Sequence, residues 1–253
     1  MSPETNHHAA DCLRLYIIDR LGSSILHDLR NGLQGILGHT ALLRSQNAGH
    51  FAASDLPQKL QAAADRCRRG TVDLNTILSL PSQQHSSVRL HGMLREQRPF
   101  LQSILRDEKT LNLSIDPTIE SARVSQQPLL QLILLWLLRA RDLHPVSRVL
   151  ELRTSRISDN NGHSAGVLPS SPLESVLLTL EDDAPSPSLS ARQQLHTPTS
   201  TPPEEPESYL FWLAGMLLQR VGATVIATFS TPGTQLAVQW PCLRSPGPSG
   251  SHR

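Results

Sequence analysis

The sequence predicts an α+β fold, in which an N-terminal helical hairpin forms a dimeric four-helix bundle and an α/β sandwich follows it. In the first 80 residues, apolar side chains recur at alternating spacings of three and four, which is the period of a bundle helix. From residue 87 onward, helical and strand-like segments alternate. Helices that cover one face of a sheet account for this second pattern.

Residues 10–80 form the first predicted domain, with two helices joined by the turn-like stretch 47–55. The repeating positions are Leu26, Leu29, Leu33, Ile36, Thr40 and Leu43 in the first helix and Leu56, Leu60, Ala63, Cys67, Gly70, Leu74 and Ile77 in the second. Asp55 suits an N-cap, and Pro81 suits a helix stop. A single hairpin leaves half of each apolar stripe in water, so we expect a homodimer. The alternative is that the stripe packs on the C-terminal part of its own chain.

Residues 87–242 form the second predicted domain, the sandwich. Helices are expected at 90–109, 126–142 and 209–221, and strands at 110–115, 149–157, 175–181, 223–230 and 234–240. The stretches 158–172 and 182–207 are rich in Ser, Pro and small polar residues, which is typical of mobile loops. The tail, residues 243–253, is expected to be disordered.

Composition excludes several classes of function. The 23 basic and 22 acidic residues leave a net charge of +1, so no global field attracts nucleic acid or an anionic membrane. The longest apolar run, residues 129–138, is much shorter than the ~20 residues of a membrane helix. Three distant cysteines favour neither a disulfide framework nor a metal site, and the eleven histidines lack metal-ligand spacing. We therefore expect a cytoplasmic protein that holds no metal and binds neither nucleic acid nor membrane.

One short segment carries chemistry, His27-Asp28-Leu29-Arg30-Asn31. His27 follows Leu26 by one position, so its imidazole lies off the apolar seam, where it can accept or release a phosphoryl group. An imidazole is largely neutral and nucleophilic at cellular pH. Asp28 is placed to hold one ring nitrogen and leave the other free.

This segment, with the apolar helix pattern that follows it, resembles the H-box of the histidine kinase dimerisation and phosphotransfer domain. The order of elements after residue 87 resembles the ATP-binding domain of the same family, so the resemblance covers most of the chain. In the family, an acid after the histidine assists transfer, and an Asn or Thr four positions after it orients a water that dephosphorylates the partner. Asp28 and Asn31 match those places, whereas Gly32 stands where the family commonly has Pro.

The resemblance implies a docking face for a receiver domain around His27. Arg30 and Gln34 follow His27 by three and seven residues and share or border its face of the helix. Gly35 and Gly38 continue along that side, and each costs about 1 kcal/mol relative to Ala in a helix interior. We interpret the glycines as a bare surface for a receiver. Simple looseness of the helix is the alternative.

The ATP-binding half departs from the family pattern at its magnesium helix. Residues 126–142 resemble the helix that carries the asparagine box, but Leu135 and Arg139 occupy the places of its two asparagines. Mg²⁺ prefers hard oxygen ligands, and the charge of Arg139 repels the ion. We expect Arg139 to pair with Asp142, one turn further along the chain.

The phosphate-binding and adenine-binding segments are degenerate as well. Residues 180–186 resemble the family box that contains Asp, Gly and Pro; Asp182 matches the aspartate that recognises adenine, but both glycines are missing. Residues 202–208 replace the glycine-rich lid with prolines and acids that repel phosphates. Residues 222–225 and 233–238 still resemble the last two strands of the family. We expect a retained fold that binds no cofactor, with Asp182 as a remnant of the site.

The sequence therefore predicts a histidine phosphotransfer protein of a bacterial two-component phosphorelay, a pseudokinase without ATP-dependent autokinase activity. Phosphohistidine at His27 would link the aspartates of two response regulator receiver domains, with Mg²⁺ held by the receiver. A hybrid histidine kinase is a further expected partner, and phosphatase activity toward a receiver stays open. One alternative is a catalytically silent scaffold that binds and regulates a histidine kinase or response regulator. Another is a kinase that still binds ATP through Asp182.

Overall fold

The computed structural model describes residues 3–44, 55–79, 87–105, 109–119, 122–144, 149–157, 175–226 and 233–242. The chain divides into two compact units, Leu13–Ser82 and a second one made of Met1–Cys12 with Gln83–Arg253. The loop expected at 158–172 and the tail expected at 243–253 lie outside the described residues. Among the described residues, no helix combines the length and apolar character needed to cross a membrane.

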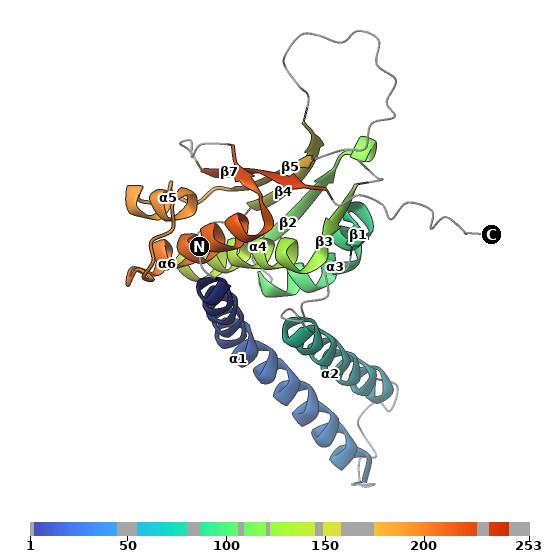
Figure 1. Ribbon diagram of the computed structural model, residues 1–253. Helices are drawn as coiled ribbons and strands as arrows, with labels where there is room; N and C mark the ends of the chain where they lie inside the picture. The colour runs from blue at the N-terminus through green and yellow to red at the C-terminus, as the bar shows by residue number, and fades with distance from the viewer. Residues whose placement is uncertain are drawn as a thin grey trace, which may run out of the picture. The chain divides into compact units, whose positions relative to one another are not determined.

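Two helices form the N-terminal hairpin, α1 (Pro3–Arg44) and α2 (Leu56–Ser79) (Figure 1). Helix α1 begins well before residue 10, where the sequence pattern starts. Asp55 immediately precedes α2, and its carbonyl accepts a hydrogen bond from the Lys59 amide at 3.0 Å. The stop expected at Pro81 lies outside the described residues, two positions beyond the end of α2 at Ser79.

Glycines let the two helices of the hairpin approach closely. A Cβ added to Gly32 would lie 2.6 Å from the Cys67 sulfur, and one added to Gly70 would lie 2.9 Å from Cγ of Leu29. Other members of the predicted seam are uncovered within one chain, since Leu26 is 58% exposed and Leu33 54%. One hairpin therefore covers only part of the seam, and the homodimer stays a prediction.

The second unit is built on a five-stranded sheet with strand order β2-β4-β5-β7-β6. The strands are β2 (Thr110–Ile115), β4 (Val149–Arg156), β5 (Ser175–Asp182), β6 (Thr224–Val225) and β7 (Thr234–Pro241). Strand β2 is parallel to β4, and the other neighbours are antiparallel. Two further short strands, β1 (Ser87–Arg89) and β3 (Arg123–Ser125), pair with each other and were not expected. A short 3₁₀ turn, η1 (Pro117–Ile119), precedes β3.

Three helices cover one face of this sheet, α3 (Leu90–Ile104), α4 (Gln126–Leu138) and α6 (Pro206–Val221) (Figure 1). The predicted α+β class and the α/β sandwich are thus confirmed. Helix α3 ends five residues earlier than expected. Helix α4 is buried on all sides from Leu129 to Leu138, which explains why its sequence shows no polar face.

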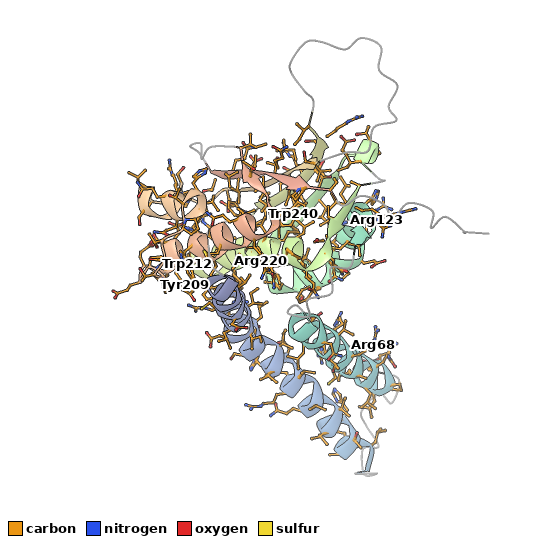
Figure 2. All side chains as sticks on the ribbon, in the orientation of Figure 1. Arg68, Arg123, Tyr209, Trp212, Arg220 and Trp240 are labelled. Carbon is orange, nitrogen blue, oxygen red and sulfur yellow. The ribbon has the colours of Figure 1, made fainter. Side chains whose placement is uncertain are left out.

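The tryptophans of this unit are packing residues. Trp136, Trp212 and Phe211 are buried, and the rings of Trp136 and Phe211 meet edge to face with centroids 6.5 Å apart. Tyr209 stacks on Trp212 at 5.7 Å (Figure 2). The Trp212 indole N–H donates to the Thr199 carbonyl at 2.8 Å, which satisfies its polar group.

The expectation of a loop over the whole of 182–207 is wrong, because this stretch contains the helix α5 (Leu189–His196). Ser188 caps it, with its hydroxyl accepting from the Ala191 amide at 3.1 Å. Helices α5 and α6 approach closely at Gly215 of α6, where a Cβ would collide with the Gln194 carbonyl of α5. Helix α5 is stabilised by this tertiary contact. Its few apolar residues give too weak a sequence pattern to be noticed.

The start of α6 also lies earlier than predicted, at Pro206 instead of residue 209. Proline occupies the first helical position, where its missing N–H costs nothing. The Glu205 carboxylate accepts from the amides of Glu207 and Ser208 at 3.2 and 2.8 Å. Part of the stretch 202–208, which we expected to stand in place of a glycine-rich lid, therefore forms the start of α6.

Candidate functional site

His27 lies in the middle of α1 with its side chain exposed. Helix α2 contacts α1 through Gly32 and Leu29, and the 100° step of a helix places His27 on the opposite side. Among the described residues its ring is held by Asn31, whose amide nitrogen lies 2.9 Å from His27 Nε2. The ring thus contacts Asn31, one turn along the helix, and among the described residues it makes no hydrogen bond to Asp28, whose carboxylate we expected to hold it.

The residues predicted to bind a receiver fall into two groups. Arg30, Gln34 and Gly38 are exposed, and a Cβ at Gly38 would meet nothing within 4 Å. Gly35 is half-buried, and a Cβ there would lie 3.3 Å from Cβ of Ala63 on α2. The close approach at Gly35 is thus to the second helix of the hairpin, whereas Gly38 borders open surface.

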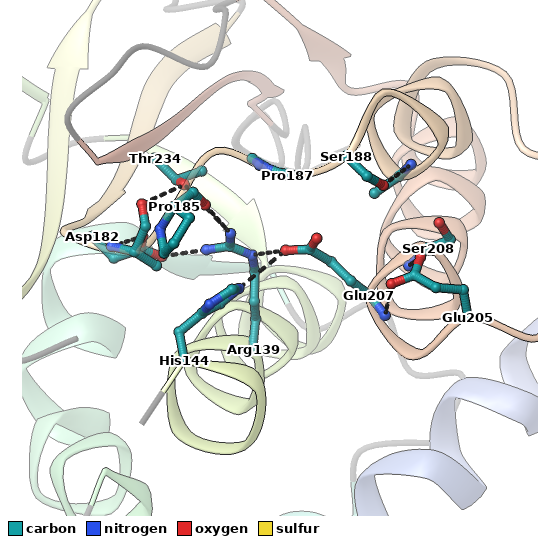
Figure 3. Close-up of polar contacts among 12 residues, drawn as sticks. Arg139, His144, Asp182, Pro185, Pro187, Ser188, Glu205, Glu207, Ser208 and Thr234 are labelled. Atoms are coloured by element: carbon teal, nitrogen blue, oxygen red, sulfur yellow. Dashed lines mark hydrogen bonds and ion pairs between the residues drawn. The ribbon is translucent and has the colours of Figure 1, made fainter. Parts of the chain in front are cut away.

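The second candidate site surrounds Arg139, which is completely buried (Figure 3). Its guanidinium donates to Asp182 Oδ2 and to Glu207 Oε1, each at 2.9 Å. It also donates to the Pro185 carbonyl at 2.8 Å and to the Thr234 hydroxyl at 3.4 Å. One side chain from the end of α4 thereby connects the end of β5, the start of α6 and the start of β7.

Aromatic rings complete the surroundings of this guanidinium. Its central carbon lies 5.4 Å from the ring centroid of Trp136 and 5.8 Å from that of Phe211. Cations are attracted to the faces of aromatic rings, most strongly where water is excluded. The positive charge of Arg139 is therefore balanced on every side by carboxylates, carbonyl oxygen or π-systems.

The expected pairing of Arg139 with Asp142 is wrong. After Leu138 the chain continues as a π-helical turn, η2 (Arg139–Leu143), which changes the positions of side chains relative to an α-helix. Asp142 instead accepts from Arg141 at 2.6 Å. Arg139 lies in the core, where the carboxylates of Asp182 and Glu207 accept hydrogen bonds from its guanidinium.

Asp182, which the sequence resemblance matches to an adenine-binding aspartate, is fully engaged within the chain. Its Oδ2 accepts from Arg139, and its Oδ1 accepts from the Ala184 amide at 3.0 Å. Burial raises the pKa of Asp182, and the positive charge of Arg139 opposes that rise. Both carboxylate oxygens are therefore already hydrogen-bonded, and the residue is only 3% exposed.

Three further residues of this cluster were missed by the sequence reasoning: Glu207, Thr234 and His144. Glu207 also contacts His144, whose Nε2 lies 3.2 Å from Glu207 Oε1. A signal for Glu207 existed, because an arginine inside a wholly apolar helix requires buried carboxylates as partners. Among the described residues, no group of three or more His, Cys, Asp and Glu side chains is placed to hold a metal ion.

Comparisons with known proteins were made at three levels. No protein-family model and no curated protein matches the sequence. Among solved structures, a bacterial phosphotransferase aligns with 14% identity and a TM-score of 0.48, covering 88% of this chain and 96% of its own. The chain is similar in fold to that protein.

Histidine kinases appear among the solved structures as well. The Acinetobacter baumannii histidine kinase AdeS aligns with 13% identity over 85% of this chain and 97% of its own, at a TM-score of 0.42. Histidine kinase ThkA, solved in complex with the response regulator protein TrrA, aligns with 12% identity over 95% of this chain and 67% of its own, at 0.42. These solved structures are thus histidine kinases and a phosphotransferase.

Proposed function

We propose that the chain is a histidine phosphotransfer protein that carries phosphoryl groups between receiver domains through His27, without using ATP. The observation that carries this proposal is the contrast between two sites. An imidazole stands exposed on the hairpin, while a buried arginine fills the pocket where a kinase would bind Mg-ATP. The chain thus has His27 as a nucleophile for phosphoryl transfer, while Arg139 fills the place where a kinase would bind ATP as its phosphate donor.

The transfer follows from the chemistry of an exposed imidazole. The lone pair on Nε2 of His27 attacks the phosphorus of an aspartyl phosphate on a receiver, an N–P bond forms, and the aspartate carboxylate leaves with the electron pair of the broken O–P bond. The reverse step on a second receiver returns the group to an aspartate. Mg²⁺ on the receiver balances the phosphoryl charge. Asp28, the next residue, supplies a carboxylate near the positive charge that develops on the ring.

Arg139 argues against a kinase reaction in this chain. A guanidinium offers no lone pair to Mg²⁺ and repels it, and the Arg139 ion pairs occupy the carboxylate that would recognise adenine. Opening the site would require breaking two ion pairs that are shielded from water. The expected partners are therefore response regulator receivers, a hybrid histidine kinase and a second copy of this chain, in the cytoplasm.

The test is phosphate transfer from a labelled receiver. Wild-type protein is incubated with each phosphorylated receiver domain of the source organism, and His27→Gln serves as the matched control because it retains size and polarity. We expect acid-labile, base-stable label on the wild type and none on His27→Gln. Label on His27→Gln would show that the site is elsewhere. Tight binding without any label would favour the silent scaffold.

A further inference from the structure

The hydrogen bond between Asn31 and His27 determines which nitrogen of the imidazole carries the lone pair. The Asn31 amide nitrogen lies 2.9 Å from His27 Nε2. An amide NH₂ group can donate hydrogen bonds but cannot accept them. With the amide oriented in this way, Nε2 is the acceptor and the neutral ring carries its proton on Nδ1.

We propose that Asn31 is the residue that sets the tautomer of His27 and keeps Nε2 as the nucleophilic nitrogen. The consequence for phosphoryl transfer rests on the proposed function, whereas the tautomer itself does not. Asp28 was expected to do this from the other side of the ring. Among the described residues, however, the hydrogen bond to the imidazole comes from Asn31.

The choice of nitrogen matters because only an unprotonated nitrogen can attack phosphorus. Nε2 is the ring nitrogen further from the backbone, so it projects furthest from the exposed face of α1, where a receiver can reach it. A histidine side chain without a partner favours the tautomer with the proton on Nε2, in which this nitrogen cannot attack. By donating to Nε2, Asn31 reverses that preference. The amide then has to move aside when phosphorus approaches, which an exposed side chain can do easily.

Two substitutions of Asn31 change the hydrogen bond to His27 in different ways. Asn31→Ala removes the donor, so the ring returns to its own preference. Asn31→Asp keeps the shape but replaces the donor by an acceptor, which holds a proton on Nε2 and blocks the nucleophile. Gln58→Glu is the matched control, because it makes the same amide-to-carboxylate change at an exposed position of α2 that lies outside the residues predicted to bind a receiver.

The direct readout is the ¹⁵N spectrum of His27, from long-range ¹H–¹⁵N correlations on the full chain at a pH where the ring is neutral. We expect Nε2 to behave as an unprotonated nitrogen in the wild type and in Gln58→Glu. In Asn31→Asp it should be protonated, and Asn31→Ala should shift toward that form. A protonated Nε2 in the wild type, or an unchanged spectrum in both Asn31 variants, would overturn the inference.

Labelling by a phosphorylated receiver gives the second readout. Asn31→Asp should slow the labelling of His27 at least about 10-fold and Asn31→Ala about 5-fold, the factor expected for one exposed hydrogen bond, while Gln58→Glu stays within about 2-fold. If the spectra change as expected but no protein is labelled, the proposed function fails and the role of Asn31 stands. If the wild type is labelled but the Asn31 variants match it in rate and spectrum, the role of Asn31 fails and the proposed function stands.

Discussion

Replacing Arg139 by methionine tests whether its ion pairs with Asp182 and Glu207 stabilise the second unit. Methionine keeps the length and packing of the side chain but removes its charge. Arg139 and Asp182 are both inaccessible to solvent in their side chains, so the substitution leaves a buried carboxylate without its cation. Removal of one partner from a buried pair costs about 3–5 kcal/mol, a large part of the ~5–15 kcal/mol stability of a domain.

The loss of stability in Arg139→Met should depend on pH in a defined direction. Burial already raises the pKa of Asp182 above its ordinary value of 3.8, and without Arg139 it rises further. A carboxyl group with a raised pKa in the folded state binds its proton more tightly there than in the unfolded chain. Its contribution to stability is therefore complete below the unfolded pKa and is lost as the pH rises through the folded pKa. Arg139→Met should be most destabilised at neutral pH and least near about pH 4.

Urea unfolding followed by tryptophan fluorescence measures this effect, because all three tryptophans belong to this unit. Arg153→Met is the control, since Arg153 is 52% exposed and its ion pair with Glu151 should contribute at most about 1 kcal/mol. Adding Asp182→Asn to Arg139→Met should recover part of the loss, because the amide oxygen can still accept from Ala184. If the free energy of unfolding of Arg139→Met alone lay within about 1 kcal/mol of the wild type at neutral pH, the reasoning would be refuted.

Three other outcomes follow from the same structure. Calorimetric titration with Mg-ATP should show no binding at physiological concentration; saturable micromolar binding that Asp182→Ala abolishes would contradict this. Leu33→Asp should convert a dimer to monomers in light scattering, because a dimer would bury the new carboxylate at a cost of several kcal/mol; a monomeric wild type would rule out the bundle. Gly32→Ala should destabilise the hairpin by about 1–3 kcal/mol, since its Cβ would lie 2.6 Å from the Cys67 sulfur, whereas Gly38→Ala should stabilise it by up to about 1 kcal/mol because its Cβ meets nothing. Equal thermal shifts for the two glycine variants would show that the helices do not pack closely at Gly32.

Much of the fold could be predicted from local patterns. The strand at Thr110–Ile115 matches its expected bounds, β5 and β7 each end one residue later than expected, and α4 begins where it was expected. Period and turn residues determine such elements locally. Helix α5 and the ribbon of β1 and β3 were not expected, because they are short and exist through contacts with distant segments.

The sequence by itself determined which chemical groups this protein has: a histidine beside the apolar seam of a helix, no asparagine in residues 126–142 and no glycine in residues 180–186. It could not determine their partners. Only the tertiary structure decided that Arg139 pairs with Asp182 and Glu207, 43 and 68 residues away, instead of with nearby Asp142. Only the structure decided that Asn31 and not Asp28 holds His27. The reason is physical: helical periodicity follows from local geometry, whereas a buried charge takes the partners that the folded core brings to it.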